Sequence, residues 1–126
     1  RKTILLQGDG SGMYASQALW SMARERSDVV VIVLRNDNYA ILEVELARVR
    51  EQDANDKMLS MMHLDDPALD WVKLAEGHGV AATRATTAEE FHAQLDAALQ
   101  KRGPCLIEAK VTDSIAPFVA MIRGAR

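Results

Sequence analysis

Two short polar clusters contain the residues best suited to chemistry, GDGS at 8–11 and NDN at 36–38. Asp9 offers a carboxylate, Asn36 an amide oxygen and Asn38 a backbone carbonyl, and these are hard oxygen ligands of the kind that Mg²⁺ prefers. The glycines of the first cluster let the backbone approach a bulky diphosphate without clashes from Cβ atoms. The pattern therefore predicts a magnesium–diphosphate site, with a plain turn as the alternative for the first cluster.

Strands and helices must position these two clusters. Each cluster follows an apolar run that is typical of a buried strand, at 3–7 and at 28–36. A helix is expected from 12 to about 26, and its first backbone N–H groups would favour a bound anion. Strands and helices alternate, which predicts an α/β fold with a parallel sheet and helices on both faces. Ligands of such sheets bind at the carboxyl ends of the strands, where both clusters are expected to lie.

The other elements are predicted from periodicity and from signals at their ends. Asp66 and Pro67 have the order expected at the start of a helix, and the polar, irregular stretch before them, from residue 52, is interpreted as a loop. Thr87 and Glu90 have the spacing of a capping box, and they would begin the helix that precedes the last strand. The expected helices cover 39–51, 66–76 and a segment from residue 87, and the expected strands cover 80–83 and 105–111.

Composition limits the classes of protein that this chain can belong to. Its 15 Lys and Arg residues against 18 Asp and Glu residues give a net charge of −3, with no basic patch for nucleic acid. The longest apolar run is too short to cross a bilayer, so no membrane contact is expected. The single cysteine, Cys105, favours a reducing, cytoplasmic location. The chain begins without a methionine just before its most informative motif, so a piece of a longer polypeptide is expected.

The order of these features resembles the diphosphate-binding motif of the thiamine diphosphate enzymes. Asp9 and Asn36 lie 27 positions apart, as that motif requires. The likeness continues in the branch that contains acetolactate synthase large subunits and benzoylformate decarboxylases, through GDGSGMYASQALWSMARE, NYAILEVELARV, DWVKLAEGHGV and GPCLIEAKV. It covers nearly the whole chain, and it implies that residues 1–126 are the C-terminal part of the diphosphate-binding domain, without the pyrimidine-binding and central domains.

The resemblance also implies roles for individual residues. Asp9 and Asn36 would bind Mg²⁺ through their side chains, and Asn38 would bind it through its carbonyl. The residues expected to contact the cofactor are Gly10, Ser11, Asn38, Tyr39 and Ala40, and those expected near the thiazolium ring or the substrate are Ile41 and Leu42.

The chain departs from the family pattern at two positions near this motif. Arg35 stands where many members carry asparagine, and the sequence names no partner for its charge. Leu42 stands where some decarboxylases carry a catalytic glutamate, which argues against a proton relay of the pyruvate decarboxylase type. It suits a benzoylformate-type decarboxylase or a carboligase. Glu43 and Glu45 follow on the expected helix, and they are interpreted as solvated side chains rather than catalytic ones.

By resemblance, the parent would be a thiamine diphosphate-dependent lyase or transferase that acts on a 2-oxo acid. This chain would anchor the cofactor and Mg²⁺, and it would be inactive alone because the activating glutamate belongs to the pyrimidine-binding domain. A homodimer or homotetramer is implied, with contacts near Trp20 or residues 39–50. FAD binding is left open.

Two other classes of function compete with this one. A non-catalytic binding or regulatory module could keep the fold, although the intact pair of Asp9 and Asn36 argues against a decayed site. A nucleotide-binding domain of another α/β family is disfavoured because the sequence lacks a P-loop lysine and a G-x-G-x-x-G fingerprint.

Overall fold

The computed structural model describes residues 1–49, 55–117 and 120–121, and these residues form two compact units. The first, called the sheet unit, combines Arg1–Arg35 with Asp70–Val111. The second, called the loop unit, consists of Asn36–Leu69 and Thr112–Arg126. The sequence clusters fall in different units, since Asp9 lies in the sheet unit and Asn36 begins the loop unit.

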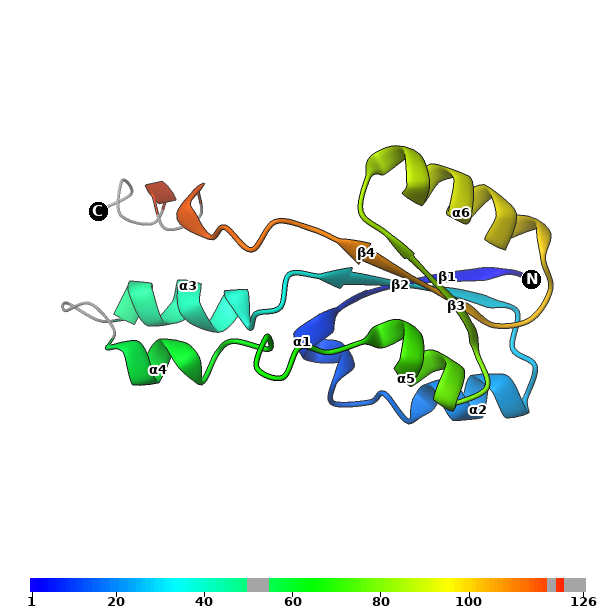
Figure 1. The fold of residues 1–126 in the computed structure, drawn as a ribbon, viewed down its shortest axis with the longest axis horizontal. Helices are drawn as coiled ribbons and strands as arrows, with labels where there is room; N and C mark the ends of the chain where they lie inside the picture. Colours follow the sequence, from blue (N-terminus) through cyan, green and yellow to red (C-terminus); the bar gives the residue numbers. More distant parts are fainter. Residues whose placement is uncertain (50–54, 118–119, 122–126) are drawn as a thin grey trace. The chain divides into compact units, whose positions relative to one another are not determined.

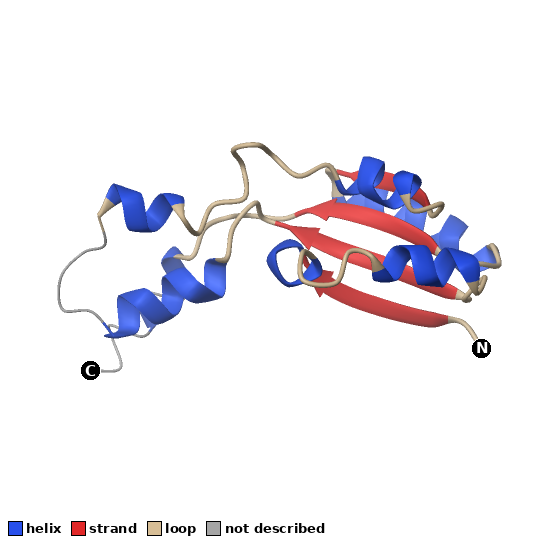
Figure 2. Cartoon of the chain, turned by 90° about the horizontal axis from the view of Figure 1, so that it is seen from below, coloured by secondary structure: helices blue, strands red, loops and turns tan. Residues whose placement is uncertain are grey.

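Within its described residues, the sheet unit contains four strands in the order β1-β2-β4-β3. All three neighbouring pairs are parallel, and Figure 2 shows the four arrows side by side. β2 lies inside the sheet and is buried along most of its length, because its β-branched run packs on both faces. The strands are β1 (Thr3–Gly8), β2 (Val29–Arg35), β3 (Ala81–Ala85) and β4 (Cys105–Lys110).

Helices cover both faces of this sheet, which confirms the predicted α/β class. In Figure 1, α6 lies above the sheet, whereas α1, α2 and α5 lie below it. The four helices are α1 (Asp9–Gly12), α2 (Ala18–Arg24), α5 (Trp71–Gly77) and α6 (Ala88–Gln100). The described residues of the loop unit contribute α3 (Ala40–Val49) and α4 (Asp56–Ser60).

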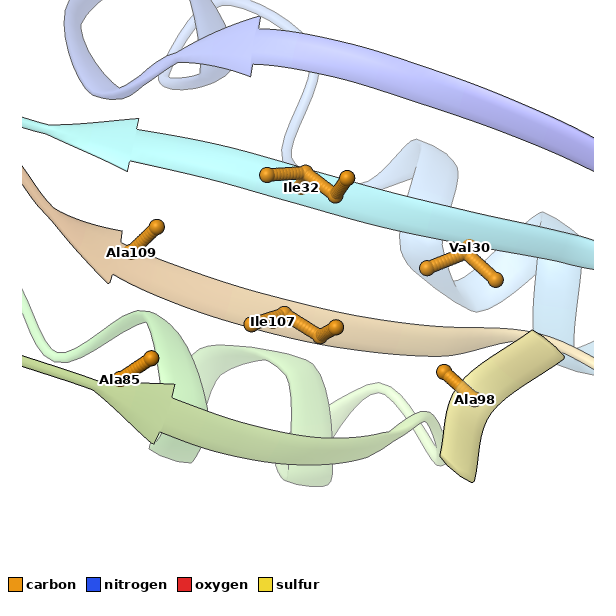
Figure 3. Close-up of a cluster of buried hydrophobic side chains, with 6 residues drawn as sticks. All are labelled: Val30, Ile32, Ala85, Ala98, Ile107 and Ala109. Carbon is orange, nitrogen blue, oxygen red and sulfur yellow. The ribbon is translucent and has the colours of Figure 1, made fainter. Parts of the chain in front are cut away.

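The core under α6 is built from small and β-branched side chains. Figure 3 shows them converging from β2, β3, β4 and α6, and alanines at three sheet or helix positions let the helix approach the sheet closely. The apolar face of α6 packs on this core, since Ala98 is buried and Phe91 and Leu95 pack against the same cluster. The buried members are Val30, Ile32, Ala85, Ala98, Ile107 and Ala109.

The predicted capping box of α6 forms with one change. Thr87 is the N-cap, and its hydroxyl accepts a hydrogen bond from the Glu90 backbone N–H at 3.2 Å. The Glu90 carboxylate, however, accepts from the backbone N–H and the hydroxyl of Thr86, at 2.7 and 2.9 Å. The backbone hydrogen bond from Thr86 is the main reason that the pKa of Glu90 is lowered.

The continuous helix expected from residue 12 to about 26 is wrong. The chain forms one turn at α1, leaves the helix after Gly12 and resumes at Ala18. Glycines at 10 and 12 weaken a helix at this point. Gly12 also packs against Trp71, because a Cβ atom added there would lie 2.7 Å from Cη2 of that ring. The last residue of the first turn therefore lies in a tertiary contact.

Two further expectations on the segment from 52 to 76 are corrected. The expected loop contains α4, whose N-cap Asn55 accepts a hydrogen bond from the Met58 backbone N–H at 3.0 Å. The next helix begins at Trp71 rather than near Pro67, and its N-cap is Asp70, which accepts from Lys73 N–H at 3.2 Å. Each true start has a side-chain cap, and such caps stabilise a helix end by about 1 kcal/mol.

The boundaries of the other elements are close to those expected. The strand predicted at 80–83 is β3, which begins one residue later and continues to Ala85. The helix predicted at 39–51 is α3, and residues 50 and 51 lie outside the described residues. Among the helices that the structure describes, none is both long and apolar enough to span a bilayer.

Candidate functional site

Asp9 lies at the carboxyl end of β1 and is 2% exposed. It is the first residue of α1, and its Oδ1 accepts a hydrogen bond from the Gly10 backbone N–H at 2.9 Å. Its carbonyl also accepts from Met13 N–H at 3.1 Å, which closes the turn. A carboxylate in the first turn of a helix is stabilised by the exposed N–H dipoles there. The sequence therefore places a buried carboxylate at the edge of the sheet where ligands bind.

The rest of the GDGS turn is held together by Ser11. The Ser11 hydroxyl donates to the Gly8 carbonyl at 3.2 Å and accepts from Gln7 Nε2 at 2.7 Å. Gly10 and Gly12 are buried, and the ring of Trp71 lies against Gly12, where a Cβ atom would point. The turn thus has one defined conformation in the sheet unit, although it is a single turn and not the start of the long helix that was expected.

In the loop unit, residues 36–39 form a turn that is hydrogen-bonded on both sides. Asn36 Oδ1 accepts from the Asn38 backbone N–H at 3.2 Å, and Asp37 has a φ of +59°. Asparagine and aspartate tolerate such turn conformations better than most residues. The turn also pairs with His63 through an isolated antiparallel bridge at Asn38. Its backbone is therefore fixed by contacts within the loop unit.

Asn38 is 9% exposed, and its side chain contacts the carboxylate of Glu43. Its Nδ2 donates to Glu43 Oε1 at 2.8 Å, and the same oxygen lies 3.3 Å from His63 Nε2. The interpretation of Glu43 as a solvated side chain is wrong, because that side chain is 11% exposed. Glu45 fits the interpretation, since its side chain is 51% exposed in a 3.6 Å pair with Arg48. The sequence analysis did not predict the contacts of Glu43 with Asn38 and His63.

One oxygen of Asn38 stands out. Asn38 Oδ1 is buried and has no hydrogen-bond partner within the described part of the chain. A buried acceptor without a donor costs about 1–3 kcal/mol, so such atoms are rare in folded proteins. This oxygen is suited to a ligand that supplies a donor or a positive charge.

Ile41 and Leu42 are both exposed, at 67% and 48%, and Ile41 lines a cavity of the loop unit. Ile41 contributes to a cavity of about 290 Å³ together with Asn36, Ala40 and residues 112–115 of the loop unit. Of the described residues, Leu42 is not among those that line it. The structure therefore brings Asn36, Ala40 and Ile41 to one cavity.

The partner of Arg35 is Glu108, on the neighbouring strand β4. Glu108 is fully buried, and its Oε1 lies 2.7 Å from Arg35 Nη1. Arg84 on β3 donates to both carboxylate oxygens, at 2.8 and 3.1 Å, and it also contacts Asp70 at 2.9 Å. The signal for this cluster was a glutamate inside the apolar run CLIEAKV.

The charges in this cluster shift one another's ionisation. Burial alone would raise the pKa of Glu108, but the hydrogen bonds from Arg84 and Arg35 outweigh it and lower that pKa. The hydrogen bond to Glu108 raises the pKa of Arg84. The backbone hydrogen bond from Lys73 is the main reason that the pKa of Asp70 is lowered. All of these groups are therefore charged at neutral pH, and the cluster ties the ends of β2, β4 and β3 together.

The ligand set for Mg²⁺ stays a prediction. Asp9, Gly10 and Ser11 share one turn of the sheet unit, while Asn36, Asn38, Tyr39 and Ala40 share one segment of the loop unit. Within residues 1–49, 55–117 and 120–121, no group of three or more His, Cys, Asp or Glu side chains is arranged to hold a metal ion.

Comparisons with known proteins identify the family of this chain. Residues 1–109 match the family model of the thiamine pyrophosphate enzyme, C-terminal TPP binding domain. The chain is 45% identical over 112 residues to the acetolactate synthase large-subunit-like protein IlvX of Mycobacterium tuberculosis. It is 38% identical over 117 residues to benzoylformate decarboxylase of Pseudomonas aeruginosa. These alignments cover 88% and 93% of the chain but only 22% and 21% of the two relatives.

Solved structures agree with the sequence comparisons. The thiamine diphosphate-dependent 4-hydroxybenzoylformate decarboxylase of Rhodococcus jostii RHA1 superposes with a TM-score of 0.78 at 35% identity. The superposition covers 90% of the chain and 21% of that structure, so the chain spans about a fifth of the proteins that it matches. By the family match over 109 residues, this chain belongs to the thiamine pyrophosphate enzymes, as their C-terminal TPP-binding domain.

Proposed function

We propose that this chain anchors the magnesium–diphosphate end of thiamine diphosphate in a longer enzyme that decarboxylates or ligates 2-oxo acids. The observation that carries the proposal is the family match over residues 1–109, which includes the GDGS turn with its buried Asp9. The full-length protein would supply the pyrimidine-binding domain and its activating glutamate. This chain alone would bind without catalysing the reaction.

The residues present fit a bound Mg²⁺ and diphosphate. Asp9 is a carboxylate that is buried at the end of a strand, and Asn36 and Asn38 supply amide and carbonyl oxygens. Mg²⁺ takes one or two carboxylates from the protein and further oxygens from phosphate and water. Asn38 Oδ1, which is buried and has no partner among the described residues, also suits a region that receives positive charge. In the proposed site, Asp9 and Asn36 hold the ion by their side chains and Asn38 by its carbonyl.

When bound, thiamine diphosphate supplies the electron sink for 2-oxo acid chemistry. The residues of this chain hold and orient that cofactor. Gly10 and Ser11 would approach the diphosphate, as would the backbone at Tyr39 and Ala40. Ile41 would limit the space beside the reacting carbon, since it lines the 290 Å³ cavity of the loop unit. Leu42 would lie near the thiazolium ring of the cofactor.

Two reaction types, decarboxylation and carboligation, are compatible with the proposed cofactor-binding role. Benzoylformate decarboxylase among the relatives and leucine at position 42 support decarboxylation of a 2-oxo acid. The likeness to an acetolactate synthase large subunit supports carboligation. A homodimer or homotetramer, a cytoplasmic location and any bound FAD stay predictions about the full-length protein. The rival view of a non-catalytic module is disfavoured by the intact buried Asp9.

The test is the variant Asp9→Ala in the full-length protein. Calorimetric titration of thiamine diphosphate in excess Mg²⁺ should show affinity reduced tenfold or more, which is about 1.4 kcal/mol. Asp96→Ala is the matched control, because Asp96 is an exposed aspartate on α6. The free energy of unfolding without cofactor should change little, by about 1 kcal/mol, because the hydrogen bond from Gly10 N–H is lost. Unchanged affinity would show that Asp9 is only a turn residue.

A further inference from the structure

The segment around His63 holds the turn at 36–39 by backbone hydrogen bonds. Tyr39 N–H donates to the Met62 carbonyl at 2.8 Å, and Leu64 N–H donates to the Asp37 carbonyl at 2.7 Å. These two bonds flank the bridge between Asn38 and His63. The proposed magnesium-binding turn is thus one side of a small two-stranded contact inside the loop unit.

Glu43 adds a side-chain link to the same contact. It lies in the first turn of α3, and one of its oxygens contacts both Asn38 Nδ2 at 2.8 Å and His63 Nε2 at 3.3 Å. The side chain of Glu43 is mostly buried, and a buried carboxylate is costly unless donors surround it. Its carboxylate therefore favours the one arrangement in which Asn38 and His63 both face it.

This contact also determines which way the Asn38 amide points. The amide nitrogen of Asn38 donates to the Glu43 carboxylate oxygen and therefore faces it. The amide oxygen is then directed away from Glu43, and it is the buried atom that has no partner in the described residues. A glutamine at position 43 could donate as well as accept, and it would permit the flipped amide.

We propose that Glu43 is a positioning residue, which links Asn38 to His63 and so fixes the turn that presents the Asn38 backbone carbonyl to Mg²⁺ before the cofactor binds. The proposal rests on the proposed function of Asn38 as a magnesium ligand. Glu43 itself contacts neither the metal nor the substrate. Its effect is to remove the entropic cost of ordering the turn during binding, which is the usual advantage of preorganisation.

The test compares Glu43→Gln with Glu45→Gln in the full-length protein. The two residues lie on the same helix, but the Glu45 side chain is half exposed and its partner is Arg48. With the cofactor present, the Mg²⁺ titration of Glu43→Gln should be weakened about tenfold, and that of Glu45→Gln should be unchanged. Without cofactor, the amides of Tyr39 and Leu64 should exchange with deuterium at least tenfold faster in Glu43→Gln alone. At saturating Mg²⁺ and cofactor, kcat should match the wild type.

A second variant, His63→Gln, tests whether the link acts as a unit. If it does, the double variant Glu43→Gln with His63→Gln should bind Mg²⁺ within about twofold of Glu43→Gln, because contacting residues are not additive. Wild-type Mg²⁺ affinity in Glu43→Gln would overturn the proposal. Faster exchange throughout the loop unit with unchanged Mg²⁺ affinity would also overturn it, as a purely structural role. If the wild type binds no cofactor, the proposed function fails, and the apo exchange result still decides whether the link exists.

Discussion

Replacing Glu108 by glutamine tests how much the buried charge cluster stabilises the sheet. The glutamine keeps the volume of the side chain and removes the charge that faces Arg35 and Arg84 at 2.7 and 2.8 Å. Removing one partner of a buried ion pair costs about 3–5 kcal/mol, because the remaining charge is desolvated without compensation. Arg84 is half exposed and keeps Asp70 at 2.9 Å, so we expect the lower end, about 3 kcal/mol.

Hydrogen–deuterium exchange of the full-length protein can measure this loss locally. A loss of about 3 kcal/mol corresponds to exchange about 10²-fold faster at the amides of β2 and β4, if these strands open together. Glu25→Gln is the control, because Glu25 is exposed in a 3.6 Å pair with Arg24, and it should change stability by less than about 0.5 kcal/mol. Exchange within threefold of the wild type in Glu108→Gln would refute the reasoning.

The same cluster should make stability depend on acid. The pKa of Glu108 is lowered in the fold, so its contribution is fully present above the pKa of the unfolded chain, about 4.3. The contribution is lost as the pH falls from there through the lower pKa of the folded state. The difference in melting temperature between the wild type and Glu108→Gln should therefore be largest near neutral pH and should shrink below pH of about 4. A difference that does not shrink as the pH is lowered from about 4 to about 2 would show that the charge of Glu108 contributes nothing.

Two further predictions concern packing and the cavity. Gly12→Ala should destabilise the sheet unit by about 1–3 kcal/mol, because the new Cβ would lie 2.7 Å from the Trp71 ring, and a fall in melting temperature would measure it. Gly77→Ala, where a Cβ meets nothing within 4 Å, should leave the melting temperature unchanged or raise it. Ile41→Phe should fill part of the 290 Å³ cavity and raise KM for 2-oxo acids with bulky side chains more than for pyruvate, as steady-state kinetics would show. An equal effect on both substrates would contradict a substrate role for this cavity.

Much of the sheet could be predicted from the sequence because strand periodicity is a local property. The apolar runs at 3–7, 28–36 and 105–111 each match a strand, and the alternation with helices correctly indicated a parallel sheet. The GDGS motif also placed Asp9 at the end of β1, where the structure finds it buried. A run of β-branched residues needs no distant partner to favour an extended conformation.

Helix ends were less predictable, because they depend on which of several capable residues is used. Asp66 and Asp70 are both residue types that suit an N-cap, and the helix uses the second, which the buried Trp71 follows directly. The ring of Trp71 also lies close to Gly12, the last residue of α1. Both corrected helix boundaries therefore adjoin one buried aromatic ring.

The charged contacts were decided by the tertiary structure alone. Arg35 and Glu108 are 73 residues apart, and they meet because β4 inserts between β2 and β3 in the sheet order. Glu43 meets His63 because residues 37–39 pair with residues 62–64. The sequence by itself determined the elements, the family motif and the types of ligand atom, since these are read within a few residues. Which charges face each other depends on strand order and pairing between distant segments, and a local hydrophobic period carries no information about either.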